Sequence, residues 1–501
     1  MQLMINTIPH YINNQCVKPV GDKLLPVYNP ATGEKTAHVV CAETIEINDA
    51  IISAKNAYAQ WSQVTPLKRA RILFNFKSLL DKNIDKLATL LTMEHGKTIE
   101  DAKGEVLRAI ELVEFSCGTP YLLQGNYSEN VGADIDTYTI KQPLGVCVGI
   151  SPFNFPVMIS TWMFIPAIAC GNTFILKPSE KDPSSTLLLA QLLQEAGLPS
   201  GVLNILQGDK ETVDALITHP DVAAVSAVGS TLAAKHIYQT AIHHGKRAHT
   251  FGGAKNHAVV MPDVDMDETA DALLGAAFGA AGERCMAISV IVAVTDAVAD
   301  NLISRLKIKI PQLKIASGMH ENVDMGPLIT QEHLAHVKNY VNVGIKEGAS
   351  LIVDGREIKG GNQSNGFFMG GCLFDKVTRD MSIYQEEIFG PVLCIVRAEN
   401  FDTAVALINE NQYGNGVSLF TRDGGIAKKF ASTINVGMIG INVPIPVPVA
   451  YHTFGGWKQS LFGDIGMHGE QNMHFYTRSK TVTVRWPEGK KEISAYHMMS
   501  H

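Results

Sequence analysis

The sequence has no surplus of basic residues. Its 501 residues include 42 Lys and Arg against 49 Asp and Glu, which gives a formal net charge of −7 at pH 7. A chain with this balance has no excess cations to neutralise phosphate groups, and no nucleic-acid-binding module is recognisable. Nucleic acid is therefore excluded as the main partner, and small molecules are the expected ligands.

Long hydrophobic runs are also missing. The longest apolar stretch, residues 155–170, is interrupted by Pro156 and Pro166 and is too short to cross a membrane. The amino terminus, MQLMINTIPHYINNQ, lacks the basic start and apolar core of a secretory signal, and it is not Arg-rich. We therefore expect a cytoplasmic protein with no membrane partner.

Cysteine motifs are absent, although the chain contains eight cysteines. The cysteines are scattered, without the CxxC or Cys/His spacing that binds zinc, so no metal site is predicted. Most of them are expected to be small buried hydrophobic residues in a reducing compartment.

Strand-like and helix-like segments alternate through the middle of the chain. GVCVGISP, NTFILKPSE, GVLNILQG and VAAVSAVGS have the pattern of short apolar strands, and helical stretches such as SSTLLLAQLLQEAG separate them. This succession predicts a doubly wound parallel sheet, with a helical region over residues 45–117 before it. A second alternating block after Gly253 predicts a second α/β domain.

The chain is longer than one hydrophobic core usually organises, so two or three structural units are expected. Two polar alternating segments, ADIDTYTIKQP and TRSKTVTVRW, are strand-like but lie far apart in the sequence. We expect them to pair as a small projecting sheet. The exposed edge of such a sheet favours homo-oligomerisation.

A ligand crevice is predicted where the loops ISPFNFP, LKPSE and AVGS meet, beyond the carboxyl ends of the parallel strands. The usual dinucleotide fingerprint GxGxxG is missing, so another feature must support a cofactor site. Lys177 and Glu180 lie where a carboxylate accepts hydrogen bonds from adenosine ribose, and Glu180 would repel the 2′-phosphate of NADP. The alternative is an ordinary ion pair in an exposed turn.

Six motifs, in order, give the chain a resemblance to the aldehyde dehydrogenase superfamily over nearly its whole length. They are PFNFP (152–156), LKPSE (176–180), VGS (228–230), FGGAKN (251–256), GERC (282–285) and EEIFGPV (386–392). Four further stretches, GAKNH, AAFGAAGERCMA, NGVSLFT and GWKQSLFG, resemble the branch of the methylmalonate-semialdehyde dehydrogenases.

The resemblance implies an aldehyde-dehydrogenase-like α/β fold with a doubly wound, Rossmann-like NAD domain, an α/β catalytic domain and a small oligomerisation extension of β-strands. The NAD domain would comprise residues 1–125 and 146–253, and the catalytic domain residues 254–441. Residues 126–145 and 476–501 would form the oligomerisation strands. Residues 442–475 would return to the NAD domain and the rim of the active site.

By the same resemblance Cys285 is the catalytic nucleophile, although a single cysteine of eight would more often be inert. Its Gly-flanked position beside Arg284 is a setting that lowers a thiol pKa and leaves the sulfur accessible. The thiolate would attack an aldehyde carbonyl to give a thiohemiacetal. The side chain of Asn154 and the backbone N–H of Cys285 would stabilise the oxyanion of this thiohemiacetal. The alternative is that Asn154 is an ordinary turn residue.

Collapse of the thiohemiacetal would pass a hydride to NAD and leave an acyl thioester on Cys285. The resemblance implies that Glu387 binds the nicotinamide ribose with Phe389 packed nearby, and that Ser230 contacts the pyrophosphate. The other implied cofactor-binding residues are Ser151, Phe153, Lys177, Glu180, Lys181 and Gly252. Taken one at a time, each of these residues could instead be an ordinary polar residue of a turn or a packing residue.

Thr250 is a departure from the hydrolytic aldehyde dehydrogenases, which carry a water-activating Glu two residues before the GG pair. A thiol acceptor with a pKa of about 8.5 is already partly ionised at neutral pH and needs less help than water. The sequence therefore predicts acyl transfer to coenzyme A, which the resembled branch performs. A Glu supplied from elsewhere would restore the alternative, a hydrolytic semialdehyde dehydrogenase that releases a free acid.

Arg108 and Arg284 match the residues that bind the substrate carboxylate in the resembled branch, and a planar guanidinium suits that contact. The alternative for Arg108 is a surface pair with Glu105 or Glu111 at helical spacing. The resemblance implies oxidation of methylmalonate or malonate semialdehyde to propionyl-CoA or acetyl-CoA, with loss of the carboxylate. The preferred semialdehyde, the pathway (valine or inositol breakdown) and the oligomer (dimer or tetramer) stay open.

Overall fold

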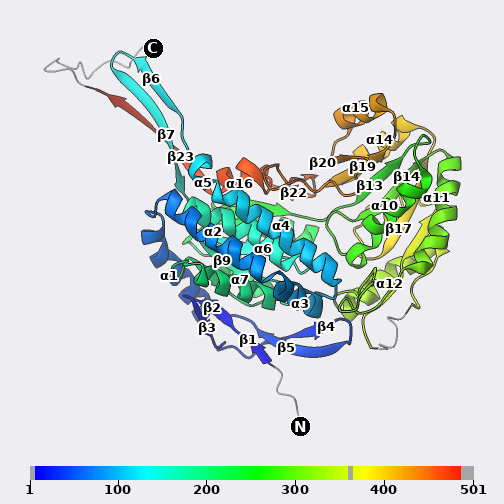
Figure 1. Cartoon of the computed structure of the whole chain (residues 1–501), viewed down its shortest axis with the longest axis horizontal. Coiled ribbons are helices and arrows are strands. Elements are labelled where there is room, and N and C mark those ends of the chain that lie inside the picture. Colours follow the sequence, from blue (N-terminus) through cyan, green and yellow to red (C-terminus); the bar gives the residue numbers. More distant parts are fainter. Residues whose placement is uncertain (1–5, 359–364, 487–501) are drawn as a thin grey trace, which may run out of the picture.

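The computed structural model describes residues 6–358 and 365–486 (Figure 1). It confirms the α/β class, with two units built on parallel sheets and a three-stranded arm that projects from the first unit. The predicted oligomerisation segment 476–501 falls partly outside the described residues, which end at Trp486. In the described ranges, no helix is both long and apolar enough to span a membrane.

The first unit contains an eight-stranded sheet with a parallel centre. Its strands follow the order β22 (Leu461–Phe462), β12 (Arg247–Phe251), β11 (Val222–Val228), β8 (Val146–Ile150), β9 (Thr173–Lys177), β10 (Leu203–Ile205), β2 (His10–Ile12) and β3 (Gln15–Val17). The chain winds outward from β8 through β9 to β10, and then returns to β11 and β12 on the other side of β8. The winding reverses between β8 and β11, and ligands of α/β sheets bind at such a switch point.

Helices cover both faces of this sheet, because successive side chains of a strand point to opposite faces. Val146, Val148 and Ile150 of β8 belong to one apolar cluster and Cys147 to the other. The first cluster is covered by α1 (Thr44–Trp61), α8 (Lys210–Thr218) and α9 (Thr231–His243). The second is covered by α2 (Pro66–Lys82), α3 (Ile84–His95), α4 (Ile99–Cys117), α6 (Pro156–Cys170) and α7 (Ser184–Glu195).

Helix α6 is apolar on every side, and all 15 of its residues are buried. A helix of this kind is stable only when other elements enclose it, and α6 lies against the sheet and the helices α2, α4 and α7. Pro156 opens the helix at a position where the missing N–H is tolerated, and Gly171 ends it with φ of 99°. The amino end of α6 therefore lies just after β8, at the switch point.

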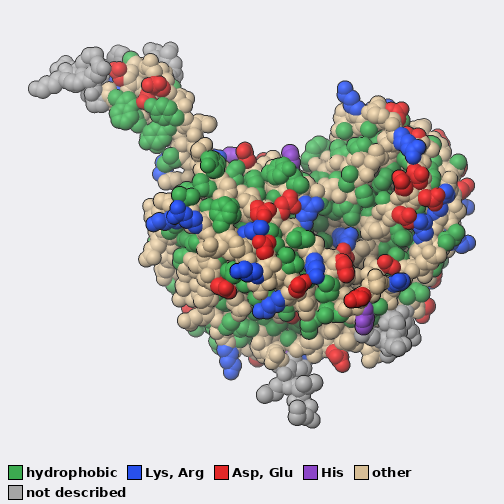
Figure 2. Space-filling view, in the orientation of Figure 1, with side chains coloured by type: hydrophobic (Ala, Val, Ile, Leu, Met, Phe, Trp, Pro, Cys, Tyr) green, Lys and Arg blue, Asp and Glu red, His purple; other side chains and the backbone are tan. Residues whose placement is uncertain are grey.

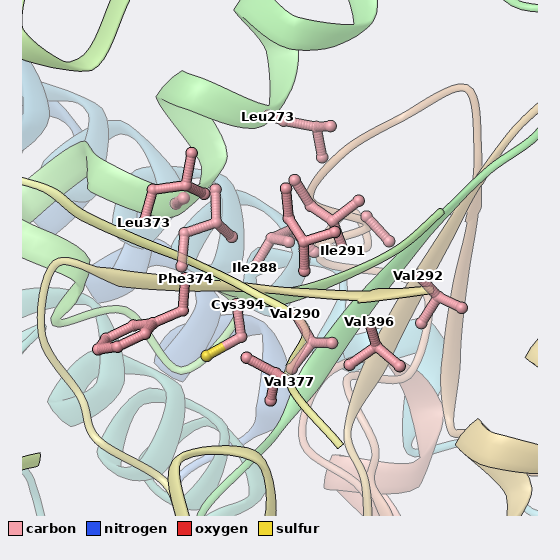
Figure 3. Packing of buried hydrophobic residues seen from close by; sticks show 14 of the residues in the cluster. Leu273, Ile288, Val290, Ile291, Val292, Leu373, Phe374, Val377, Cys394 and Val396 are labelled. Carbon is pink, nitrogen blue, oxygen red and sulfur yellow. The ribbon is translucent and has the colours of Figure 1, made fainter. Parts of the chain in front are cut away.

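The second unit contains a seven-stranded sheet that is parallel except at one edge. Its order is β15 (Ser350–Val353), β16 (Cys372–Asp375), β17 (Val392–Ala398), β14 (Ile288–Val294), β13 (Asn256–Val260), β19 (Gly416–Phe420) and β20 (Met438–Ile441). Figure 3 shows how Val290 of β14, Phe374 of β16 and Val396 of β17 share one apolar core. The helices of this unit are α10 (Met266–Phe278), α11 (Asp296–Lys309), α12 (Gln331–Lys346), α14 (Phe401–Glu410) and α15 (Gly424–Thr433).

The arm consists of β6 (Tyr127–Gly132), β7 (Ile135–Pro143) and β23 (Thr477–Arg485), so the two polar segments do pair as expected. The register places alternate side chains of each strand on opposite faces. One face, called the apolar arm face below, carries Tyr127, Tyr138, Ile140, Val482 and Val484 together with the charged Asp136 and Lys480, and the other carries Thr137, Thr139, Thr481 and Thr483. Figure 2 shows hydrophobic side chains exposed along the arm.

Several short elements complete the chain, and the amino-terminal strands among them were not predicted from the sequence. A separate sheet is formed by β1 (Asn6–Ile8), β5 (Glu34–Val40) and β4 (Leu24–Asn29). The remaining elements are α5 (Thr119–Leu122), η1 (Gly279–Gly282), η2 (Ile310–Gln312), α13 (Ser382–Gln385), β18 (Tyr413–Gly414), β21 (Trp457–Lys458) and α16 (Gly469–Phe475). The division into domains at the predicted boundaries stays a prediction.

Candidate active site

Cys285 follows a tight left-handed segment between the two units. Ala280 and Ala281 have φ of 49° and 54°, values that residues with a side chain seldom adopt. Gly282 continues the turn at 74°, and a Cβ there would lie 2.4 Å from the carbonyl oxygen of Gly390. Only glycine fits at this position. The flanking glycine of GERC thus brings the cysteine close to the EEIFGPV loop.

Two asparagines hold the backbone of Cys285, and sequence reasoning assigned neither a role. The carbonyl oxygen of Cys285 accepts hydrogen bonds from Nδ2 of Asn256 at 2.8 Å and from Nδ2 of Asn415 at 3.0 Å. Both asparagines are buried. The available signal was their place inside FGGAKN and NGVSLFT, the segments that carried the family resemblance.

A crevice of about 460 Å³ opens at the switch point on one side of Cys285. The loops after β8, β9 and β11 form much of its wall, together with the EEIFGPV loop. The crevice brings together all nine predicted cofactor residues, and Cys285 and Asn154 share its wall. The nine are Ser151, Phe153, Lys177, Glu180, Lys181, Ser230, Gly252, Glu387 and Phe389.

Charged and polar groups of the crevice are held by near neighbours. Lys177 Nζ lies 2.9 Å from Glu180 Oε2. Burial acts to raise the pKa of Glu180, but the charges of Lys177 and Lys181 and the hydrogen bonds to the carboxylate together outweigh it, so this pKa is lowered. The hydroxyl of Ser230 caps α9, accepting from the backbone N–H of Ala233 at 3.4 Å. An ionised carboxylate and an open helix amino end are groups that bind a ribose and a pyrophosphate respectively.

Glu387 lines the crevice together with Cys285. Its Oε1 accepts the backbone N–H of Ala254 at 2.9 Å, and burial raises the pKa of this carboxyl to about 7. Phe389, two residues on, has φ of 58° and meets the ring of Phe153 edge to face at 5.8 Å. Both rings line the crevice together with Glu387.

A second cavity, of about 340 Å³, opens on the other side of Cys285. It is called the arginine cavity below, because Arg108 and Arg284 both lie in its wall, as predicted substrate residues should. Phe155, Met158, Trp162, Ile445, Val447 and Phe454 supply apolar walls. Cys285 is therefore the residue at which the arginine cavity and the crevice adjoin.

Arg108 has both of the features that the sequence offered as alternatives. It lines the arginine cavity, and its Nη1 also lies 2.9 Å from Glu111 Oε2. Glu105, the other suggested partner, is buried and pairs instead with Lys97 at 2.7 Å. Arg284 bonds to Asp101, a contact that the sequence did not predict.

The Lys97–Glu105 pair is a buried support for Asn154. Lys97 Nζ donates to the carbonyl oxygen of Asn154 at 2.5 Å, while Glu105 Oε1 accepts the N–H groups of Val157 and Met158 in the first turn of α6. A carboxylate at a helix amino end and an ammonium partner compensate each other's burial. The pair thereby fixes the turn in which Asn154 lies, a contact that single-residue reasoning missed.

Burial reverses the pKa shift that the sequence predicted for Cys285. Arg284 was expected to lower the pKa of the Cys285 thiol, and its charge acts in that direction. Removal of the thiol from water and the nearby Glu387 charge act more strongly, and they raise the pKa of Cys285 to about 12. The thiol therefore has to pass its proton to another group as it reacts.

Thr250 lies outside the walls of both cavities. It is fully buried in β12, and its hydroxyl donates to the carbonyl oxygen of Ala234 in α9 at 2.8 Å. Hydrolytic aldehyde dehydrogenases carry a water-activating Glu at this position. In this chain the position holds a hydroxyl that is already hydrogen-bonded to α9. Within residues 6–358 and 365–486, no cluster of three His, Cys, Asp or Glu side chains is arranged to hold a metal ion.

The doubly wound sheet, with a ligand-sized crevice at its switch point and a cysteine in the wall of that crevice, fits an aldehyde dehydrogenase. Residues 17–482 match the model of the aldehyde dehydrogenase family, and the chain belongs to that family.

Relatives of known name share nearly the full length. A malonate-semialdehyde dehydrogenase of Pseudomonas aeruginosa is 53% identical, over 97% of each chain. A structure described as a putative methylmalonate-semialdehyde dehydrogenase of Sinorhizobium meliloti complexed with NAD is 52% identical, with a TM-score of 0.96 over 98% of this chain and 100% of that one. Methylmalonate-semialdehyde dehydrogenase of Oceanimonas doudoroffii is 53% identical, with a TM-score of 0.95 over 97% and 99%.

Proposed function

We propose that the protein oxidises malonate or methylmalonate semialdehyde with NAD and transfers the acyl group to coenzyme A, losing the substrate carboxylate as CO₂. The observation that carries the proposal is the position of Cys285 between two different cavities. One cavity has carboxylates and a helix amino end suited to a dinucleotide, and the other has two arginines suited to an acid group. The names of the relatives support the same substrate class.

The residues of the crevice fit NAD. Glu180 and Glu387 are placed to accept hydrogen bonds from the two riboses, and Ser230 with the amino end of α9 is placed for the pyrophosphate. Bound NAD accepts the hydride that leaves the aldehyde carbon. Glu180 would lie against a 2′-phosphate, so NADP should bind less well.

The first half of the reaction makes an acyl-enzyme. Arg108 and Arg284 orient the substrate carboxylate, and the Cys285 sulfur forms a bond to the aldehyde carbon as its S–H bond breaks and the proton passes to solvent water. Asn154 Nδ2 and the backbone N–H of Cys285 donate to the oxyanion, and loss of hydride restores the carbonyl as a thioester. Lys97 and Glu105 keep Asn154 in place.

The second half removes the carboxylate and then the acyl group. The C–C bond to the carboxylate breaks, CO₂ leaves, and its electron pair passes to the α-carbon, which takes up a proton. The thiolate of coenzyme A then attacks the thioester carbonyl and releases Cys285 as the leaving thiolate. Because Thr250 lies in the β12–α9 contact and offers no base, a thiol that ionises by itself is the favoured acceptor.

The test is a rapid-mixing experiment with malonate semialdehyde and NAD, with and without coenzyme A. Without coenzyme A we expect a burst of NADH close to one equivalent per active site, and then a slow steady rate. With coenzyme A, fast turnover should follow a burst of the same size, since hydride transfer comes first. Cys285→Ala is the control and should bind NAD but give no burst.

One observation favours the hydrolytic alternative. Glu387 lies near Cys285, and its pKa of about 7 allows it to take a proton from water at neutral pH. If free acid forms as fast without coenzyme A as thioester forms with it, the chain is a hydrolytic semialdehyde dehydrogenase.

The arm suggests that the enzyme assembles as a homo-oligomer, a dimer or a tetramer. Its apolar arm face lies on a sheet of three strands that projects from the first unit, and a second copy of the chain would cover it. A cytoplasmic location remains a prediction from the sequence.

A further inference from the structure

The cations of the arginine cavity are already paired with carboxylates. Lys97 pairs with Glu105, Arg108 with Glu111 and Arg284 with Asp101. Glu100, also in the wall of this cavity, adds a further negative charge. A substrate carboxylate that enters therefore meets guanidinium groups that already have carboxylate partners.

The two arginine pairs differ in how firmly their acids are held. Glu111 also accepts the backbone N–H of Ala450 at 3.0 Å through its other oxygen, which ties it to the return segment. The Arg108–Glu111 pair is the more exposed of the two, but the Asp101 carboxylate bonds to Arg284 through Oδ1, and in the described part of the chain no second hydrogen bond ties it to another segment. Asp101 is therefore the acid that a ligand can replace most easily.

Gly279 leaves room for the guanidinium of Arg284. An ideal Cβ on Gly279 would lie 2.5 Å from the guanidinium carbon of Arg284, so the guanidinium lies directly on the glycine backbone. The group is held between Gly279 and Asp101 in the cavity wall. A ligand carboxylate can therefore reach Arg284 while the arginine stays where it is.

We propose that Asp101 is a specificity-determining residue, which the substrate carboxylate displaces from Arg284. The inference rests on the proposed function and names a residue that controls its selectivity. A partly exposed ion pair is worth only about a two- to fivefold factor in an equilibrium constant. A substrate that offers both oxygens to the guanidinium replaces Asp101 at small cost, whereas an uncharged aldehyde leaves the pair closed.

The test compares Asp101→Asn with Glu100→Gln. Both changes remove one negative charge from the same cavity wall and from the first turn of α4, but only Asp101 bonds to Arg284. Steady-state constants for malonate semialdehyde and propionaldehyde would be measured with NAD and coenzyme A. Inhibition constants for propionate, which has the carboxylate but no aldehyde, would be measured against propionaldehyde.

We expect Asp101→Asn to lower both KM for malonate semialdehyde and the inhibition constant of propionate by about two- to fivefold. Glu100→Gln should lower the same two constants by a smaller factor. In both variants, KM for propionaldehyde should change less than KM for malonate semialdehyde and less than the inhibition constant of propionate. Equal effects of the two variants would show only a general change of charge and would overturn the proposal. A raised KM in Asp101→Asn would overturn it too, because Asp101 would then be orienting Arg284 for the substrate.

Failure of the proposed function gives a different result. In that case the wild-type enzyme itself shows no preference for malonate semialdehyde over propionaldehyde, and propionate inhibits no variant.

Discussion

Gly279 is a single residue at which the proposed recognition of a carboxylate can be tested. Alanine here would push the end of a flexible side chain, the Arg284 guanidinium, and no backbone atom is among its nearest neighbours. We expect Gly279→Ala to change the melting temperature by less than about 3 °C. It should lower kcat/KM for malonate semialdehyde about tenfold, but lower that for propionaldehyde less, because a displaced arginine loses its ligand.

Steady-state kinetics and a thermal melt together check this expectation. A large drop in melting temperature would mean that the backbone has no room for a methyl group. Equal losses for both aldehydes would mean that Arg284 does not bind the carboxylate.

Glu283, beside Arg284 in GERC, should make stability depend on pH. Its side chain is fully buried, Oε1 accepts the N–H of Ile329 at 3.1 Å, and burial raises the pKa to about 8 from its ordinary value of 4.5. The folded protein therefore holds this proton more tightly than the unfolded chain does. Its contribution to stability is complete below about pH 4.5 and is lost as the pH rises through about 8.

Glu283→Gln imitates the protonated acid and keeps the acceptor for Ile329. We expect the melting temperature of the variant, measured without ligands by calorimetry, to fall less between pH 5 and pH 9 than that of the wild type. His95 and His333 face Glu283 at 3.8 and 3.6 Å, and both are present in the two proteins. An identical pH dependence would show that Glu283 is ionised throughout or unimportant for stability.

For single residues, the sequence predicted which side chains line the two cavities better than it predicted their hydrogen-bond and ion-pair partners. All the predicted site residues lie in the walls of the two cavities, because family motifs mark turns and strand ends that meet at a switch point. The partner of Arg284 was not predictable, since Asp101 is far away in sequence. The direction of the Cys285 pKa shift depends on burial, and the neighbouring residues in the sequence do not show how deeply a side chain is buried.

Helix α4 shows how one element supplies a polar wall. Asp101, Gly104, Glu105 and Arg108 recur at the spacing of one helical face, and all four line the arginine cavity. The sequence predicted a helical region over residues 45–117, which includes this helix. It could not distinguish a polar stripe that faces a cavity from one that faces solvent, because both have the same period.

Gly104 provides a test of this face. An added Cβ would meet nothing within 4 Å, so alanine fits and adds helix propensity of about 0.5–1 kcal/mol. We expect Gly104→Ala to raise the melting temperature by a few degrees and to narrow the cavity. KM for methylmalonate semialdehyde, which carries the extra methyl group, should then rise more than KM for malonate semialdehyde.

Gly275→Ala is the matched control, because Gly275 lies inside α10 with nothing within 4 Å of an added Cβ, and it is not in the wall of the cavity. It should give a similar gain in stability and leave the ratio of the two KM values as it is. A changed ratio in this control would remove the link to the α4 face.

For the whole molecule, the parallel sheets were predictable because strands buried on both faces consist of continuous runs of apolar residues. The strands β1–β5 were not, since these short segments have no periodic pattern of useful length. The pairing of β7 with β23 was expected from two polar alternating segments, and the register of nine residue pairs came only with the structure.

The apolar arm face leads to a prediction about assembly. Val482 lies on that face and Thr481, the next residue, on the opposite one. Val482→Asp should shift the enzyme toward smaller species, because a charge would have to be buried against a second chain. Thr481→Asp is the matched control, and light scattering after size-exclusion chromatography measures both. Equal masses for wild type and Val482→Asp would place the contact between copies elsewhere.

The order of synthesis sets a condition on how the first unit is completed. The edge of β12 is covered by β22, and β7 is covered by β23, so strands from the end of the chain finish structures begun near its start. Roughly two hundred residues separate Phe251 from Leu461, its partner. At about 5–20 residues per second, a ribosome needs roughly ten to forty seconds to make them. During that time the edges of β12 and β7 in the nascent chain are not yet covered. Another strand or another chain can then pair with these open edges in place of β22 and β23.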